Sequence, residues 1–342
     1  MKIGVFYPEV FPLSMKIYAD TIMHQLKGLG FTFALFKDIK NIPENADLYW
    51  DPRVGGGALP EINKNIVSKP IVATLHGTAL FTLPIKENRF RFMDTFDMIR
   101  HRKRFKQQWV KYQNHFEKII TVSNYAKDEI VKNLSIDAER IIPIHHAVDE
   151  TLFYPENEQI EKVLPNGYFL HVSVFQPKKN IDRLIKAYLS ITDQNETPNL
   201  ILLVPGYNKT CTHPKVSILT KQQSREEVAT FLQNAFGFIF PSLHESFGLP
   251  IIEAMACGVP VITSNVTGCP EIAGGAAILV NPRSTKEIAD ALLELTENRK
   301  LREEIINKGL VRCSNFSWRK SASKHAEIFN AALNTFNNKS NN

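Results

Sequence analysis

The sequence predicts an α/β protein made of two successive, doubly wound parallel-sheet units, and three observations predict it. Short apolar runs typical of buried strands alternate with amphipathic stretches of helical length, first over residues 2–134 and again over 168–264. The chain has 342 residues, which is too long for one core and fits two domains of about 150 to 200 residues. A polar, proline-bearing connector near residues 147–165 separates the two runs.

In the first run, the apolar segments predict strands at residues 2–8, 31–37, 46–52 and 70–77. A further strand is expected to continue directly into a helix over 118–134. The stretch "IYADTIMHQLKGLG" has the spacing of an amphipathic helix and ends at Gly30, a residue type that commonly stops helices. Strand and helix alternation of this kind favours a parallel sheet with helices on both faces.

In the second run, strands are expected at 168–175, 199–206, 215–220, 236–242 and 259–264, and helices at 180–192, 225–235 and 249–258. A last helix follows "FSW" and is long enough to reach back across a domain boundary. The expected organisation is therefore an N-terminal Rossmann-like domain over 1–155, a C-terminal one over 156–320, and a helix with a disordered tail over 321–342. The active site is expected in the crevice between the domains, outside the carboxyl ends of the strands.

Composition excludes several classes of protein. The chain is 44% apolar and 22% charged, as soluble globular proteins are. Its longest apolar runs fall short of the roughly 18 residues that span a bilayer, and the N-terminus lacks the pattern of a secretory signal. A cytoplasmic location is therefore expected. The four cysteines share no CxxC spacing, which argues against a zinc site and against a disulfide framework.

A basic, aromatic segment over residues 89–118 concentrates much of the net charge of +6. Two interpretations stay open: a solvated helix face, or a patch that contacts anionic lipid or a phosphate-bearing substrate. Nucleic acid is a weaker hypothesis, because no known nucleic-acid-binding motif accompanies the charge.

The segment "SLHESFGLPIIEAMACGVP" (242–260) carries two acids in an apolar context. It is interpreted as the end of a strand, a loop with Glu245, and a helix with Pro250 near its first position, Glu253 in its first turn and Gly258 just past its end. Loop and helix N-terminus place backbone N–H groups where an anion such as phosphate is favoured. Two carboxylates there can each bind sugar or ribose hydroxyls, although Glu253 can equally be a favourable charge at a helix start.

Residues 240–282, "FPSLHESFGLPIIEAMACGVPVITSNVTGCPEIAGGAAILVNP", resemble the large retaining glycosyltransferase family 4. Glu245 and Glu253 match that family's E-x7-E pair. The similarity covers most of the chain, through "HVSVFQPKKNIDRLIKAY" and "FSW", and is weaker before residue 70. The resemblance implies the GT-B fold, in which two Rossmann-like domains face each other and the C-terminal one holds most of a nucleotide-sugar donor.

Carried over by position, the resemblance implies that Glu253 binds the donor ribose and that Glu245 binds hydroxyls of the transferred sugar. It implies that Lys179 neutralises the diphosphate and that His76 faces the reacting sugar. Further donor contacts are expected from backbone amides and from one lysine: Ser246, Phe247, Gly248, Leu249 and Lys178. A lone histidine after a strand is otherwise more often a structural hydrogen-bonding group.

The sequence departs from the family pattern at two places. Val174 stands where the family usually has an arginine, and Lys178 or a basic residue of the other domain could replace that charge. The first loop, "YPEVFPLSMKIY", lacks the usual Gly-Gly pair. Gly55-Gly56-Gly57 lies too far along to replace it; it could line the acceptor side or be a surface turn.

The expected reaction is the transfer of a hexose from a UDP- or GDP-linked sugar to a hydroxyl of a glycan or lipid-linked acceptor, with retention of the anomeric configuration. The resemblance implies same-face attack, with the departing diphosphate stabilised by Lys179, loop amides and the helix N-terminus. No D-x-D occurs, so metal independence and no cofactor are expected. Family habit favours bacterial polysaccharide, O-antigen or glycolipid synthesis, at the inner face of the cell membrane.

Three alternatives stay open at this point. A nucleotide-sugar epimerase or a sugar phosphorylase can share the same fold. From a different class, a non-catalytic sugar-nucleotide-binding partner would also fit the missing arginine and the missing glycine pair.

Overall fold

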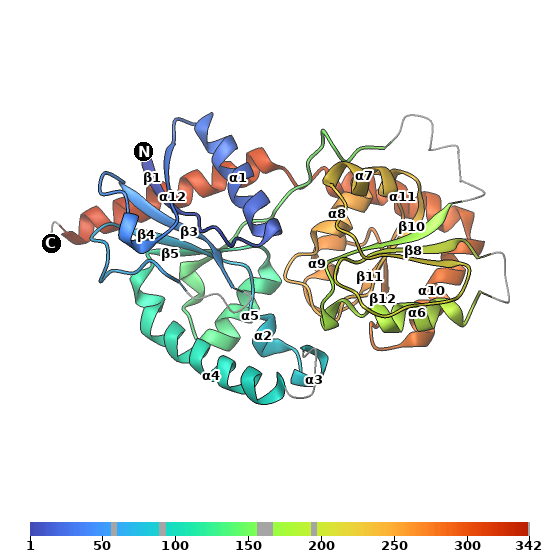
Figure 1. Ribbon diagram of the computed structural model, residues 1–342. Helices are drawn as coiled ribbons and strands as arrows, with labels where there is room; N and C mark the ends of the chain where they lie inside the picture. Colours follow the sequence, from blue (N-terminus) through green and yellow to red (C-terminus); the bar gives the residue numbers. More distant parts are fainter. Residues whose placement is uncertain (56–59, 89–93, 156–166, 193–196, 341–342) are drawn as a thin grey trace. The chain divides into compact units, whose positions relative to one another are not determined.

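The computed structural model describes residues 1–55, 60–88, 94–155, 167–192 and 197–340, and these form two compact units (Figure 1). Each unit contains one six-stranded, all-parallel sheet. The predicted class, an α/β protein with two doubly wound parallel sheets, is confirmed.

The sheet of the first unit has the order β2-β1-β3-β4-β5-β6. Its strands are β1 (Lys2–Phe6), β2 (Thr32–Phe36), β3 (Leu48–Val54), β4 (Ile71–Leu75), β5 (Lys118–Thr121) and β6 (Ile141–Pro143). The helices between them are α1 (Leu13–Lys27), α2 (Ala79–Thr82), α4 (Asp94–Tyr112) and α5 (Asn124–Leu134). Strands β3 and β4 are buried almost throughout, and β4 has the nearly continuous apolar sequence expected of a strand covered on both faces.

The C-terminal helix α12 (Trp318–Ser340) belongs to the first unit, although the second unit precedes it in the chain. Figure 1 shows α12 beside α1. Its residues Ala322, Phe329 and Ala332 join a core cluster with Trp50 of β3 and side chains of α1. Because Phe329 is fully buried there, α12 completes the hydrophobic core of the first unit rather than covering its surface.

The sheet of the second unit has the order β12-β11-β10-β7-β8-β9. Its strands are β7 (Tyr168–Val172), β8 (Asn199–Leu203), β9 (Val216–Leu219), β10 (Ala235–Phe240), β11 (Val261–Ser264) and β12 (Ile278–Val280). Its helices are α6 (Ile181–Leu189), α7 (Arg225–Gln233), α8 (Leu249–Ala256), α9 (Cys269–Ala273), α10 (Thr285–Glu297) and α11 (Arg299–Cys313). The short helix α3 (Ile85–Asn88) also packs on this unit.

Chain order in the second sheet explains where a ligand can bind. From β7 the chain continues outward to β8 and β9, whereas β10 leads in the opposite direction to β11 and β12. The connections after β7 and β10 therefore diverge, and such a switch point leaves room for a ligand at the carboxyl ends of the strands. The loops that carry Lys179 and Glu245 follow these two strands.

Two local predictions differ from the structure. Helix α1 ends at Lys27, because Gly28 to Gly30 already form a turn in which Gly30 has φ +83°. The second unit begins at Ala147 rather than at 156, because the chain after His146 packs on α7 and α8. In the part of the chain that the structure describes, no helix combines the length and apolar character needed to cross a bilayer.

Candidate functional site

The loop between β10 and α8 holds Glu245, Ser246, Phe247 and Gly248. Gly248 is the N-cap of α8 with φ +91°, a conformation that favours glycine. Leu249 and Pro250 are the first two helical residues and Gly258 follows the helix end, as predicted. The loop therefore reverses sharply and directs its backbone toward the N-terminal end of α8.

A second loop, after β11, fixes the position of Glu245. Gly268 donates its backbone N–H to the carbonyl of Glu245 at 2.8 Å, and the N–H of Glu245 donates to Oγ1 of Thr267 at 3.1 Å. A Cβ at Gly268 would lie 2.7 Å from the carbonyl oxygen of Ser246. Thr267 itself has φ +61°, which is uncommon for a β-branched residue. The sequence analysis missed both residues, whose only local signal is "TG" after a strand.

Lys179 and Glu245 form a close ion pair. Nζ of Lys179 donates to Oε1 of Glu245 at 2.6 Å, and both side chains are mostly buried. Burial alone would raise the pKa of Glu245, but the charges of Lys179 and Lys178, with hydrogen bonds from Lys179 and Ser242, hold that pKa below its usual value. Glu245 is therefore an ionised acceptor near neutral pH. An ammonium has three N–H donors, so Lys179 can bind Glu245 and an anion together.

Lys179 is held in place through its neighbours in the short 3₁₀ helix Pro177–Lys179. The carbonyl of Lys178 accepts from the backbone N–H of Leu243 at 2.7 Å. The buried side chain of Asn180, which has φ +65°, donates to the carbonyls of Pro241 at 2.9 Å and Pro282 at 2.7 Å. These bonds join the loop after β7 to the loop after β10. The sequence analysis did not select Asn180.

His171 lies on β7 in the same unit and is fully buried. Its Nδ1 donates to the carbonyl of Ile239 at 2.7 Å, because a carbonyl can only accept, and its Nε2 lies 2.8 Å from Oγ of Ser173. Burial lowers the pKa of His171 to about 4, and the nearby charge of Lys179 contributes in the same direction. His171 is therefore neutral at physiological pH and acts as a structural support.

Glu253 lies in the second turn of α8, not in the first as predicted, because the helix starts at Leu249. Nη2 of Arg225 is 3.1 Å from Oε1 of Glu253, close enough for an ion pair but without hydrogen-bond geometry. Burial raises the pKa of Glu253, and the charge of Arg225 opposes this. A helix-start charge is thus excluded as its main role, since Glu253 is 5% exposed and lies beyond the first turn.

Val174 is 57% exposed, between the end of β7 and the 3₁₀ helix. Among the arginines of the same unit, Arg183 and Arg283 each have protein partners. Arg183 donates to Asn180 and to the carbonyl of Pro282, and Arg283 makes a two-point contact with Glu87 of α3. The hydrogen bonds from Arg283, with its charge, lower the pKa of Glu87.

In the first unit, His76 follows β4 directly, as predicted, and is half-buried. Its Nε2 lies 2.7 Å from the carbonyl of Pro52 and must donate to it, which leaves Nδ1 as the acceptor of the neutral ring. Burial lowers the pKa of His76 to about 4, against the opposing effect of that hydrogen bond. His76 is therefore neutral at pH 7, with a fixed tautomer.

Tyr18 of α1 lies at the centre of a histidine cluster that the sequence analysis missed. Its ring makes an edge contact with His76 at 5.2 Å and stacks on His146 at 4.8 Å. Its hydroxyl lies 2.6 Å from Nε2 of His325 on α12. Tyr18 and His325 are 307 positions apart in the chain, so local sequence patterns could not predict their contact.

The hydrogen bonds of this cluster have one consistent direction. Nδ1 of His325 must donate to the carbonyl of Ser321, so its Nε2 accepts from the Tyr18 hydroxyl. Nε1 of Trp50 donates to Oγ1 of Thr74, and that hydroxyl lies 3.1 Å from the Tyr18 oxygen. Burial lowers the pKa of His325 to about 4. The arrangement requires a neutral His325.

Of the three glycines at 55–57, the structure describes Gly55, whereas Gly56 and Gly57 lie outside the described residues. Gly55 has φ +121°, and a Cβ there would be 3.1 Å from the backbone nitrogen of His76. Gly55 therefore allows β3 to end close to His76, a local structural role.

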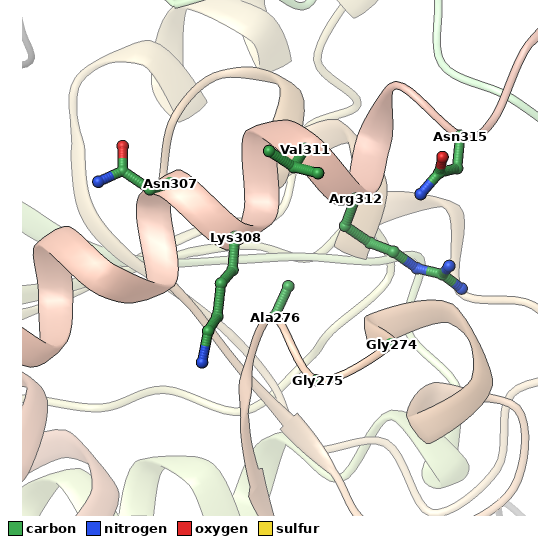
Figure 2. A pocket seen from close by; sticks show the side chains of 8 residues that line it. All are labelled: Gly274, Gly275, Ala276, Asn307, Lys308, Val311, Arg312 and Asn315. Atoms are coloured by element: carbon green, nitrogen blue, oxygen red, sulfur yellow. The ribbon is translucent and has the colours of Figure 1, made fainter.

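A cavity of about 490 Å³ lies between α11 and the turn after α9 (Figure 2). Its lining does not include the predicted site residues. Arg312 on its wall donates to the carbonyls of Ile272 and Glu271 and lies over the ring of Phe316, which in turn makes an edge contact with Phe247. Arg312 of the cavity wall is thus linked through Phe316 to the loop that holds Glu245. Within the described ranges, no group of three or more side chains is arranged to hold a metal ion.

Two protein-family models match the chain. The model described as "Glycosyltransferase Family 4" matches residues 22–152, and "Glycosyl transferases group 1" matches residues 155–312. Among curated relatives, the O-antigen chain mannosyltransferase B of Escherichia coli is 28% identical over 72% of this chain. An uncharacterized glycosyltransferase of Methanocaldococcus jannaschii is 28% identical over 89% of this chain and 83% of its own length.

Other mannosyltransferases of Escherichia coli and Salmonella typhimurium are also similar. The matched part spans 66% of mannosyltransferase B and 31% of the serotype-specific mannosyltransferase WbdA, so this chain covers less than two thirds of each.

Solved structures confirm the fold. Sucrose-phosphate synthase from Thermosynechococcus elongatus has a TM-score of 0.73 and 16% identity, and the match covers 98% of this chain and all (100%) of that one. HepE of Anabaena, solved with UDP and glucose, has a TM-score of 0.68 and 16% identity, over 96% of this chain and 99% of that one. The fold is therefore of the GT-B type, as the resemblance implied.

Proposed function

Because the chain belongs to the family 4 glycosyltransferases, we propose that it transfers a hexose from a nucleotide-diphosphate sugar to a hydroxyl acceptor. The single observation that carries this proposal is the buried Lys179–Glu245 ion pair at the switch point of the second sheet. It supplies a cation for a diphosphate and an ionised acceptor for sugar hydroxyls within one loop system.

The proposal assigns a role to each group of the second unit. Lys179, assisted by Lys178, neutralises the diphosphate as the sugar departs. Glu245 accepts hydrogen bonds from the hexose hydroxyls, and Glu253 accepts them from the ribose. Backbone amides at the start of α8 contribute further donors to the sugar and phosphate oxygens, from the residues Ser246, Phe247, Gly248 and Leu249.

His76 is proposed to act on the reacting sugar through its Nδ1. Since Nε2–H is engaged by the Pro52 carbonyl, Nδ1 of the neutral ring is an acceptor for a sugar hydroxyl. A neutral ring also avoids placing a positive charge beside an anomeric carbon that becomes cationic in the transition state. Replacement of His76 by Gln should therefore reduce turnover more than donor affinity.

Mannose is the hexose that we propose for the donor. The support is that several similar curated proteins are named mannosyltransferases, three of them in O-antigen synthesis or serotype determination. The nucleotide base of the donor is not assigned from these comparisons. HepE was solved with UDP, so UDP and GDP donors are both tested. A thermal-shift screen with UDP- and GDP-linked glucose, galactose and mannose should give the largest rise in melting temperature with one mannose donor.

Retention and metal independence are parts of the same proposal. In the proposed step, the acceptor oxygen attacks the anomeric carbon on the face from which the diphosphate leaves, and a phosphate oxygen takes the proton. NMR of the product should show the α-anomer from an α-linked donor. Activity should be unchanged in 5 mM EDTA, roughly a thousandfold excess over bound metal at micromolar enzyme. An inverted product or EDTA-sensitive activity would contradict these parts.

We propose an acceptor at an anionic membrane surface, because of the outward face of α4. Phe96, Ile99 and Val110 are 75%, 50% and 55% exposed, and they share this face with exposed basic residues: Arg100, Lys103, Arg104, Lys106 and Lys111. Exposed apolar groups among lysines and arginines are typical of helices that lie at a lipid interface. Arg102 is different, since it turns inward and donates to the carbonyl of Leu83.

Vesicle sedimentation tests this contact. Wild-type protein should bind vesicles with 30% phosphatidylglycerol, and binding should fall by about tenfold when Arg100, Lys103, Arg104 and Lys106 are changed to Gln. The matched control changes four exposed basic residues of the second unit to Gln: Lys286, Arg299, Lys300 and Lys308. Equal loss in both variants, or no binding by wild type, would show that α4 is only a solvated helix.

A further inference from the structure

Arg225 lies between an aromatic ring and the carboxylate of Glu253. It is the first residue of α7, whose start is fixed by a capping box in which Ser224 and Glu227 exchange side-chain and backbone hydrogen bonds. Its guanidinium lies 4.9 Å over the ring of Phe153 and 3.1 Å from Oε1 of Glu253. Helices α7 and α8 pack against each other, so Arg225 approaches Glu253 from the neighbouring helix (Figure 1).

The carboxylate of Glu253 can accept more hydrogen bonds than the described residues donate to it. Its side chain is 7% exposed, and among the described residues Oε1 has no hydrogen-bond donor. Buried polar atoms are normally hydrogen-bonded, so such an oxygen is suited to a donor from outside the chain. Arg225 lies at ion-pair distance from this carboxylate and balances its charge.

We propose that Arg225 is a positioning residue for donor binding: it pairs with the carboxylate of Glu253 and orients it, so that both carboxylate oxygens can accept hydrogen bonds from the vicinal hydroxyls of a ribose. This inference rests on the proposed function, because it takes Glu253 as the group that binds the ribose. It adds a residue that the E-x7-E motif does not contain and that lies on a different helix.

The charges around Glu253 explain why such a residue is needed. Burial favours the neutral acid, and the negative charge of Asp149 favours it further, whereas Arg225 stabilises the carboxylate. Cys257, the C-cap residue of α8, adds no charge, since burial raises its pKa to about 12. A protonated Glu253 would offer an O–H donor in place of one acceptor, and a diol binds less well to it. Phe153, which is buried, supports the guanidinium from the other side.

Calorimetric titration of nucleoside diphosphates tests the inference. The probes are UDP and GDP and their 2′,3′-dideoxy analogues, which lack both hydroxyls, at pH 5.5, 7 and 8. Arg225→Gln should weaken binding of the better ribonucleotide by roughly tenfold at pH 7, and by more at pH 5.5. Affinity for the dideoxy analogue should stay within about twofold. Arg225→Lys should restore most of the preference for ribose, because it keeps the charge.

Two further variants separate the possible outcomes. Arg299→Gln removes an exposed Arg–Glu pair on α11 and should leave all affinities unchanged. Phe153→Leu removes the ring under the guanidinium and should lower the ribose preference in the same direction by a smaller factor, which keeps the inference testable if Arg225→Gln does not fold.

The inference is wrong if Arg225→Gln keeps the wild-type ratio of ribo to dideoxy affinity at every pH, or if it weakens both nucleotides equally, as a purely structural residue would. The proposed function fails separately: wild-type protein would then bind neither UDP nor GDP, or Glu253→Gln would leave the ribose preference intact.

Discussion

Val174 occupies the position at which the family resemblance implies an arginine, and its side chain is exposed in the loop that leads to Lys179. Arg183 and Arg283 of the same unit are paired with other protein groups. In the proposed function, the charge of the leaving diphosphate is therefore met mainly by Lys179 and Lys178. Because the side chain of Val174 is exposed, a positively charged residue at this position should not disturb the core.

Val174→Arg should strengthen binding of the nucleoside diphosphate by about threefold to tenfold, since one more charge-assisted hydrogen bond becomes available in a half-exposed site. Isothermal titration at 50 and 300 mM salt measures this, and the gain should shrink at the higher salt concentration. Val174→Gln is the control for side-chain size. Equal affinities for all three proteins would mean that position 174 does not face the diphosphate.

Gly268 shows how a residue outside the E-x7-E motif controls its geometry. Gly268→Ala places a Cβ 2.7 to 2.8 Å from the carbonyl oxygens of Ser246 and Glu245, so the loop must shift. Its φ of −73° is ordinary, so the effect is steric and not conformational. We expect transfer to fall by at least tenfold, with a melting temperature lowered by only a few degrees.

Gly28→Ala is the matched control for that substitution. Gly28 has φ −64°, and its nearest neighbour to an added Cβ is 3.3 Å away. Activity should be close to that of wild type. If Gly268→Ala is as active as Gly28→Ala, the loop position is not critical for the reaction.

At the scale of elements, α12 connects stability to pH through His325. The folded pKa of His325 is about 4, below the ordinary value of 6.5. The unfolded chain therefore binds more protons between these values, and stability that is present above pH 6.5 is lost as pH falls toward 4. His76 and His146, whose pKa values are also lowered by burial, act in the same direction.

Between pH 7 and pH 5, His325 alone should cost about 2 kcal/mol of unfolding free energy. Calorimetry of wild type and His325→Gln at the two pH values measures this, because Gln can still accept from Tyr18 without titrating. The melting temperature of wild type should drop more than that of the variant. Equal drops would show that His325 is not neutral in the folded protein.

At the scale of the whole molecule, the repeated alternation of apolar runs and amphipathic stretches was sufficient to predict two parallel sheets. Strands such as β4 and β10 are buried throughout most of their length, so their composition is unambiguous. The bounds of α8 were also predictable, because Pro250 and Gly258 mark its two ends. The turn of α8 that holds Glu253 was misplaced, although the start of the helix was predicted correctly: in a helix that begins at Leu249, residue 253 is the fifth helical residue and lies past the first turn of 3.6 residues.

Contacts between distant parts of the chain could not be predicted. Tyr18 and His325 meet only because α12 returns to the first unit. Arg225 and Glu253 meet because α7 and α8 pack together, although no spacing rule links positions on two helices. Thr267 and Gly268 contact Glu245 because β10 and β11 are neighbours and their loops end at the same edge. The roles of Glu245, Glu253, Lys179 and His76 stay predictions.

The most direct test is transfer of hexose from UDP- and GDP-linked sugars to a membrane-extracted glycan or glycolipid acceptor, with release of the nucleoside diphosphate as the readout. Wild-type protein should use one donor, and Lys179→Gln and Glu245→Gln should each lower kcat by about a hundredfold or more while remaining folded. Full activity of both variants, or release of isomerised sugar without any acceptor, would contradict the account.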